Sequence, residues 1–160
     1  MTSTPARLTA ALLALAVGIV PVAALAVTAA RVAGAPAWVE IPFRLVCHGI
    51  DSRSLEIAGV AMPICARCFA MYAGGLAGIA AFFALRLRGP IPLLWLLVAL
   101  APMALDGLSQ ATGLRESSNV LRVVTGLAAG TVAMIWLLSR VEESSRRQAA
   151  GGPQAPISPS

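Results

Sequence analysis

The chain has 160 residues, of which 58% are hydrophobic and only 12% are charged, and its mean hydropathy is +0.83. Soluble domains carry roughly 25% charged residues, so this composition excludes a soluble globular domain. The net charge is +5, but the basic residues flank long apolar segments, which indicates membrane topology and not nucleic-acid binding.

The first apolar segment, residues 8–30, follows Arg7 and contains no charged residue. A bilayer span needs about 20 apolar residues, so this segment predicts a first transmembrane helix. Small residues near its end, such as Ala26 and Ala30, also fit the cleavage site of a secretory signal peptide. The uncharged run is longer than the roughly 7–15 residues of a signal-peptide core, which favours a retained helix.

Three further apolar segments predict three more spans, at about residues 68–85, 91–108 and 119–138. Residues 141–160 are rich in Ser, Arg, Gly and Pro, which is typical of a disordered tail. The sequence therefore predicts an all-α integral membrane bundle of about four transmembrane helices, forming a single membrane domain over residues 1–140.

Two of these predicted spans carry glycine pairs with GxxxG spacing. The pairs are Gly74 with Gly78 and Gly126 with Gly130. Glycines at this spacing let helix backbones approach closely in a membrane, although glycine is also simply common in such helices. Close helix packing at these glycines is one expectation.

The distribution of basic residues predicts the orientation of the chain. With four spans, one group of arginines falls on a single side: Arg7, Arg86, Arg88, Arg140, Arg146 and Arg147. Cytoplasmic loops carry an excess of Lys and Arg, so both termini are expected in the cytoplasm of a cell-membrane protein. The segment 31–67 and the loop 109–118 then share the extracytoplasmic face.

The segment 31–67, together with the start of the next span, contains the only His and all three Cys of the chain. Zinc favours four tetrahedral N/S ligands, and the candidate set is Cys47, His48, Cys65 and Cys68. Three of them with water in the fourth place would correspond to a catalytic zinc site. Alternatively, Cys65 and Cys68 form a redox-active or structural disulfide, with Arg67 lowering a thiol pKa. Ordinary buried thiols are the third interpretation, and the sequence leaves all three open.

A second polar cluster interrupts the apolar pattern after residue 105. Ionisable residues at membrane depth are costly, which makes them functional candidates. Asp106 and Glu116 are candidate acid–base catalysts, but Asp106 also suits a structural ion pair with Arg115 or Arg122. The side chains that suit an anionic ligand are Arg53, Gln110, Arg115, Asn119 and Arg122. Three residues of this region, Ser117, Ser118 and Asn119, equally suit the N-cap of the last helix.

These motifs resemble those of a known family. The motifs, in chain order, are Cys47-His48, Arg53-Ser54, Pro63-x-Cys65-Ala66-Arg67-Cys68, Tyr72-x-Gly74, Asp106-Gly107-x-x-Gln110, Gly113-x-Arg115-Glu116-Ser117 and Leu121-Arg122-x-x-Thr125-Gly126. Over roughly residues 45–135 the chain resembles a family of small prokaryotic membrane proteins known as domain-of-unknown-function family 2085. The resemblance implies a multi-pass membrane protein with this arrangement of polar motifs, and it implies no known reaction.

The polar residues favour a hypothesis about function. Zinc bound by the Cys/His set would polarise a bond or activate water, Arg115 and Arg122 would bind an anionic headgroup, and Asp106 or Glu116 would transfer a proton. The hypothesis is a metal-dependent enzyme that acts on a lipid or lipid-linked phosphate at the extracytoplasmic face. Two alternatives stay open: a non-catalytic carrier, sensor or accessory protein with a structural Cys/His site, and a membrane thiol–disulfide protein. The expected partners are the bilayer and an anionic lipid, with no nucleic acid.

Overall fold

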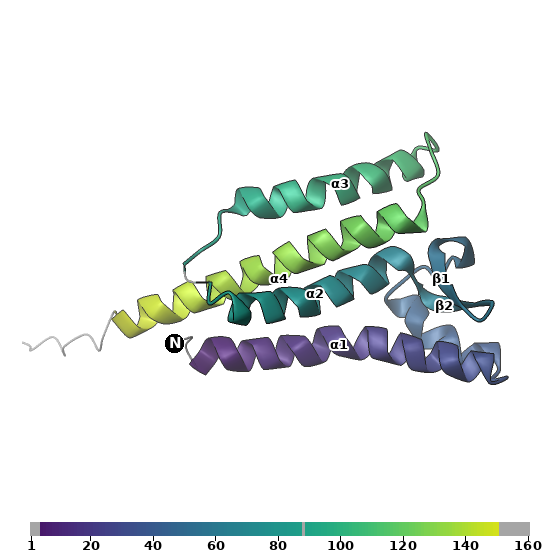
Figure 1. Cartoon of the computed structure of the whole chain (residues 1–160), viewed down its shortest axis with the longest axis horizontal. Helices are drawn as coiled ribbons and strands as arrows, with labels where there is room; N and C mark the ends of the chain where they lie inside the picture. Colours follow the sequence, from purple (N-terminus) through teal and green to yellow (C-terminus); the bar gives the residue numbers. More distant parts are fainter. Residues whose placement is uncertain (1–3, 88, 151–160) are drawn as a thin grey trace, which may run out of the picture.

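The structure is a computed structural model that describes residues 4–87 and 89–150. Its elements in chain order are α1 (Thr4–Val32), the 3-10 helices η1 (Ala37–Leu45) and η2 (Asp51–Arg53), the strands β1 (Ser54–Ile57) and β2 (Val60–Cys65), α2 (Ala66–Ala84), α3 (Leu93–Ala111) and α4 (Asn119–Ala150). The four long helices lie lengthwise beside one another, and the strands lie at one end of the bundle (Figure 1). We call this end the hairpin end.

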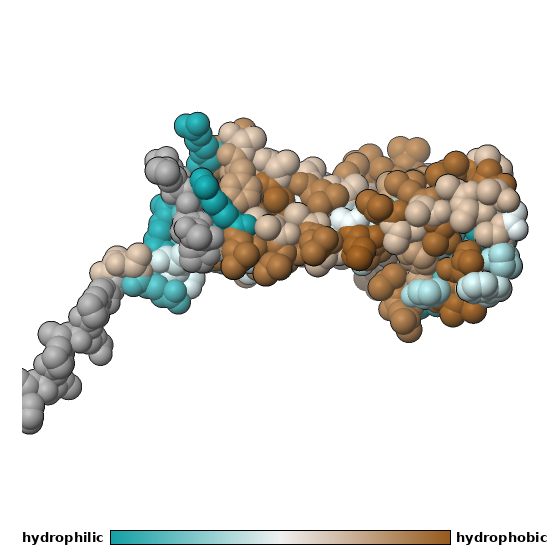
Figure 2. Space-filling model, turned by 90° about the horizontal axis from the view of Figure 1, so that it is seen from below, coloured by the Kyte–Doolittle hydropathy of each residue, from teal (hydrophilic) through white to brown (hydrophobic). Residues whose placement is uncertain are grey.

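All four long helices are long and apolar enough to cross a membrane. In the space-filling view, hydrophobic residues dominate the middle of the bundle, and hydrophilic residues gather toward its two ends (Figure 2). This distribution is what a bilayer-spanning chain requires, because its charged groups must lie outside the hydrocarbon. The structure confirms the predicted all-α membrane bundle of four spans.

Helix α4 has 32 residues, more than the roughly 20 that a bilayer span needs. It continues through residues 141–150, where the composition predicted the beginning of a disordered tail. Two ion pairs at i,i+4 spacing, Glu142–Arg146 and Glu143–Arg147, favour the helix there. The remainder of that tail, residues 151–160, lies outside the described part of the chain.

Helices α2 and α4 run parallel and touch along their backbones. A Cβ atom added at Gly126 would lie 2.7 Å from the carbonyl oxygen of Arg67, and one at Gly78 would lie 2.5 Å from that of Thr131. Gly74 and Gly130 are closer still to backbone atoms of the facing helix. All four glycines of the two GxxxG pairs therefore serve close helix packing, as expected from their spacing.

A short antiparallel hairpin, β1–β2, precedes α2, and the sequence analysis did not anticipate it. Its two-residue turn places Ala58 at φ 51° and Gly59 at φ 76°; such turns require positive φ at both central residues. Met62 and Ile64 of β2 pack with Ala24 of α1 in a small buried core. This packing fixes the end of β2, and with it Cys65, at the start of α2.

Helix α3 lies at the side of the bundle and contacts mainly α4. Within the part of the chain that the structure describes, Asp106 is the only residue of α3 that is buried. Apart from Ser109 and Gln110 near its C-terminal end, the other side chains of α3 are exposed or half-buried apolar groups, as expected for a helix that faces lipid on most sides.

Candidate functional site

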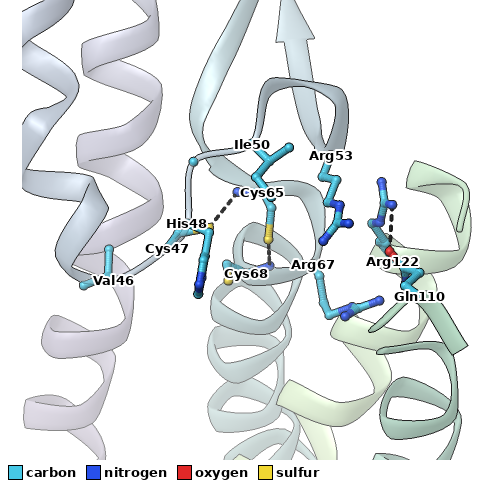
Figure 3. Close-up of a pocket in the computed structure, with 11 residues that line it drawn as sticks. Val46, Cys47, His48, Ile50, Arg53, Cys65, Arg67, Cys68, Gln110 and Arg122 are labelled. Atoms are coloured by element: carbon cyan, nitrogen blue, oxygen red, sulfur yellow. Dashed lines mark hydrogen bonds between the residues drawn. The ribbon is translucent and has the colours of Figure 1, made fainter. Parts of the chain in front are cut away.

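A pocket of about 310 Å³ opens at the hairpin end, where the loop after η1, the start of α2, the end of α3 and the start of α4 meet. Its lining includes the three cysteines, His48, Gln110 and three arginines: Arg53, Arg67 and Arg122. Figure 3 shows the cysteines and His48 on one side of the pocket and the arginines on the other. The pocket therefore has three thiols on one side and arginine side chains on the other.

The three cysteines converge in space. Their Sγ atoms lie within 4.8 Å of one another, and all three thiols are free and half-buried. The backbone N–H of Cys65 donates to Cys47 Sγ at 3.2 Å, and that of Cys68 donates to Cys65 Sγ at 3.4 Å. Hydrogen bonds donated to sulfur favour the thiolate form. The group is thus suited to bind a metal ion or to undergo thiol chemistry.

Cys65 is the N-cap residue of α2, where the helix dipole also favours negative charge. The hydrogen bond from the Cys68 thiol has the largest influence on the pKa of Cys65. Together with the backbone N–H donors and despite partial burial, this bond lowers the pKa of Cys65 to about 5. The structure therefore favours a thiolate at Cys65 at neutral pH.

His48 does not belong to the close group of sulfur atoms, although it lines the same pocket. Its side chain is exposed beside Cys47 (Figure 3). Adjacent residues in an extended segment point in different directions, which explains why Cys47 and His48 do not converge together. Of the four predicted metal ligands, the structure brings three together and leaves His48 near the mouth.

Asp106 lies at the centre of an ion-pair network. Its side chain is almost fully buried, with Arg67 bound to Oδ2 and Arg115 bound to Oδ1 at 2.9 Å. Gln110 Nε2 also donates to Oδ2 at 2.9 Å. The expected Asp106–Arg115 pair is present. Arg67 is a partner that the sequence analysis missed, although a charged residue directly before a predicted span was a signal for one.

Arg122 is 6% exposed, yet its partners are neutral amides. Its guanidinium donates to Asn119 Oδ1 at 2.7 Å and to Gln110 Oε1 at 3.0 Å. Gln110 therefore links Arg122 to Asp106, and no Asp106–Arg122 ion pair forms among the described residues. A buried charge without an opposite charge in contact is costly, which makes Arg122 a functional candidate.

The remaining predicted site residues divide between structural contacts and solvent. Asn119 donates to the carbonyl oxygen of Ser54 at 3.0 Å and so ties α4 to β1. Ser118 caps α4 by accepting from the N–H of Leu121 at 3.2 Å. Glu116 is exposed in the loop between α3 and α4 and is absent from the pocket lining. Arg53 is exposed and lines the pocket.

The fold and the site define a class: a multi-pass helical membrane protein with a thiol group and an arginine-lined pocket at one end. Residues 47–136, more than half of the chain, match the family model described as "Predicted membrane protein (DUF2085)". The chain belongs to this family. The matched region begins at Cys47. It includes every residue that lines the pocket except Val46, which lies just before it.

Two archaeal proteins, both described as uncharacterized, are similar in sequence. The chain is 44% identical to a protein of Methanocaldococcus jannaschii over 99 residues, which cover 60% of this chain and 64% of that protein, just under two thirds of its length. It is 36% identical to a protein of Methanothermobacter thermautotrophicus over 89 residues, 55% of this chain and 80% of that protein. No solved structure matches the chain.

Proposed function

We propose that this protein is a zinc-dependent enzyme of the cell membrane that acts on the phosphate group of a lipid or lipid-linked substrate at the extracytoplasmic face. The observation that carries the proposal is the meeting of two groups in one pocket. Three free thiols lie within 4.8 Å of one another on its wall, and three arginines line the same space.

The thiol group suits zinc. Zn–S bonds are about 2.3 Å long, so the sulfur atoms of a tetrahedral site lie roughly 3.8 Å apart. The separation between these sulfur atoms, at most 4.8 Å, is close to this spacing. Catalytic zinc sites have three protein ligands and one position open to water or substrate, whereas His48 as a fourth ligand would close the site. Zinc bound in this way supplies a Lewis acid and lowers the pKa of bound water.

The arginines suit a phosphate group. Guanidinium groups bind phosphate oxygens in pairs, with two parallel hydrogen bonds. No acidic side chain lines the pocket among the residues that the structure describes. Arg122 carries its charge into the pocket with only amide oxygens as partners. An anionic ligand would give Arg122 the opposite charge that none of its described hydrogen-bond partners supplies.

The contacts of Asp106 change the role proposed for it. Both carboxylate oxygens are engaged by Arg67 and Arg115, which leaves Asp106 suited to position Arg67 and not to transfer a proton. A metal ion held by Cys47, Cys65 and Cys68 would supply the activation of water that Asp106 then need not provide. Glu116, predicted as the second acid–base group, is exposed in a loop and would need a loop movement to reach a substrate.

The proposed orientation rests on the end of the bundle opposite the hairpin. Arg7 lies near the start of α1 and Arg86 just after the end of α2. Arg140 lies on the same side, because it donates to the carbonyl oxygen of Ile91, just before α3. Under the positive-inside rule, that side is cytoplasmic and the pocket faces out.

Metal content, measured together with free thiols on detergent-purified protein, tests the proposal. We expect about one zinc ion per chain in the wild type and none in Cys65→Ser/Cys68→Ser, because two of the three sulfur ligands are removed. His48→Ala serves as the matched variant and should retain zinc if three thiolates suffice. Protein without metal, with two of three thiols blocked until reduction, would contradict the proposal.

A thiol–disulfide function is the second candidate, and one observation favours it. Cys65 begins a CxxC sequence at a helix N-terminus, and its pKa is lowered to about 5, as in thiol oxidoreductases. The same measurement separates the two functions, because a redox protein changes its free-thiol count with reductant and carries no metal.

A further inference from the structure

We infer that a second cavity, an apolar groove between α1, α2 and α4, binds the hydrocarbon chain of an anionic membrane lipid whose headgroup occupies the arginine-lined pocket. The inference rests on the proposed function only for the anionic headgroup. It adds a binding site for the hydrocarbon chain of the same lipid. The groove has a volume of about 430 Å³.

The lining of the groove is almost wholly apolar. It includes Val17 of α1, Met71 and Gly75 of α2, and Met134 and Leu137 of α4. Apart from the Cys68 thiol, Tyr72 contributes the only polar side-chain group among the described lining residues. A cavity of this composition cannot satisfy the hydrogen bonds of a polar ligand, but it can bury hydrocarbon.

The groove and the pocket are neighbours. Cys68 and Val46 line both of them. In the close-up, Val46 lies on the side of the cysteines that is away from the arginines (Figure 3). A ligand that passes Cys68 would therefore have its charged group among the arginines and its apolar part along α2. Its polar–apolar junction would lie beside the thiol group.

The position of the groove within the bundle favours a lipid as its occupant. The three helices that form it are candidate membrane spans, and the groove residues Val17, Gly75 and Met134 lie well inside those spans. A hydrocarbon chain at this depth can enter from the bilayer without crossing water. The charge at one end and the apolar length at the other match an amphiphile and not a free phosphate ion.

Two ligands with the same phosphate group separate the pocket from the groove. Dioleoyl phosphatidic acid has the chains that glycerol 3-phosphate lacks, and both are added to the full-length protein in detergent micelles. We expect the lipid to bind about tenfold more tightly, because packing of its chain along the groove adds contacts that glycerol 3-phosphate cannot make. Equal affinity for the two ligands in the wild type would overturn the inference without any variant.

The matched variants are Ala133→Phe, which fills the groove, and Ala128→Phe, which adds the same ring at an exposed position of α4 outside both cavities. Ala133→Phe should weaken lipid binding about tenfold and leave glycerol 3-phosphate binding unchanged. Ala128→Phe should change neither. Unchanged lipid affinity in Ala133→Phe would also overturn the inference.

Arg122→Gln and the zinc content keep the two proposals distinguishable. Arg122→Gln should weaken both ligands, because it alters the shared headgroup site. If zinc is absent but the lipid still outbinds glycerol 3-phosphate, the enzyme proposal fails and the groove assignment stands. If zinc is present and the two ligands bind equally, the groove assignment fails alone.

Discussion

Helices α2 and α4 touch along their backbones, whereas α3 reaches the rest of the molecule through polar side chains near one of its ends. The α2–α4 contact depends on four glycines that have no room for a Cβ atom. The attachment of α3 depends on Asp106, which binds Arg67 and Arg115, and on Gln110, which binds Arg122.

The difference shows how the candidate site is connected to the bundle. In a membrane, helices gain little from the hydrophobic effect and associate by close packing or by interhelical hydrogen bonds. The α2–α4 pair uses close packing and provides a rigid base for Arg67 and Arg122. Helix α3 uses hydrogen bonds, and these are the same bonds that form the wall of the pocket. Loss of the polar network should therefore loosen α3 and the pocket together.

Gly130→Ala should have the largest effect on stability. The new Cβ would overlap the carbonyl group of Met71, and separating two packed backbones belongs to the upper part of overpacking costs, about 3 kcal/mol. Gly18→Ala is the matched control, because its Cβ would make an ordinary 3.7 Å contact with Leu76. Unfolding in mixed micelles measures both, and equal stabilities would contradict the backbone-contact account.

Asp106→Asn should have the next largest effect. Loss of the carboxylate leaves Arg67 and Arg115 without their ion-pair partner. Because these side chains are 22% and 52% exposed, water recovers part of the loss, and we expect a cost of about 2 kcal/mol, below the roughly 3–5 kcal/mol of a fully buried pair. The same unfolding assay applies. Asp51→Asn, at an exposed position of η2, should stay within about 0.5 kcal/mol of wild type.

Gln110→Leu should destabilise the protein by about 1 kcal/mol, because it removes the hydrogen bonds to Asp106 and Arg122 but leaves both ion pairs of Asp106. Gln148→Leu makes the same change at an exposed position in α4 and should have no measurable effect. A cost for Gln110→Leu as large as that for Asp106→Asn would show that α3 depends on the amide and not on the carboxylate.

Arg147→Ala should have the smallest effect. Its ion pair with Glu143 measures 2.8 Å, but the arginine side chain is 78% exposed, and exposed pairs at i,i+4 spacing contribute about 0.3–0.5 kcal/mol. The effect should disappear at high salt. A larger loss would mean that the C-terminal part of α4 is held by more than helix-local contacts.

Composition and apolar segment length were sufficient to predict the four spans. These signals are local, because a helix must satisfy its backbone hydrogen bonds within its own segment when it crosses lipid. The GxxxG spacing indicated close helix packing at the four glycines, but the pairing of α2 with α4 was known only from the structure. By contrast, the hairpin depends on packing against α1 by Met62 and Ile64, and no periodic pattern in so short a segment marks it.

For the site, the sequence identified the residue types but not all of their pairings. Cys47 lies 18 residues before Cys65, and only the hairpin brings the two sulfurs together. Arg67 lies between the two cysteines of the CxxC sequence, which suggested that it lowers a thiol pKa. Its partner in the structure is Asp106, 39 residues later. Pairings over such distances are set by tertiary structure, which explains why Arg67 was missed and why His48 was grouped with the thiols.

The parallel pairing of α2 and α4 has a consequence for biogenesis. A chain that inserts its helices in order must return to the first face of the membrane through α3 before α4 can lie beside α2. Until α4 is in place, Gly74 and Gly78 of α2 have no helix to pack against. Arg122 cannot yet contact Gln110 of α3. Because α4 contributes Arg122 to the pocket, the candidate site is complete only after this last helix has inserted.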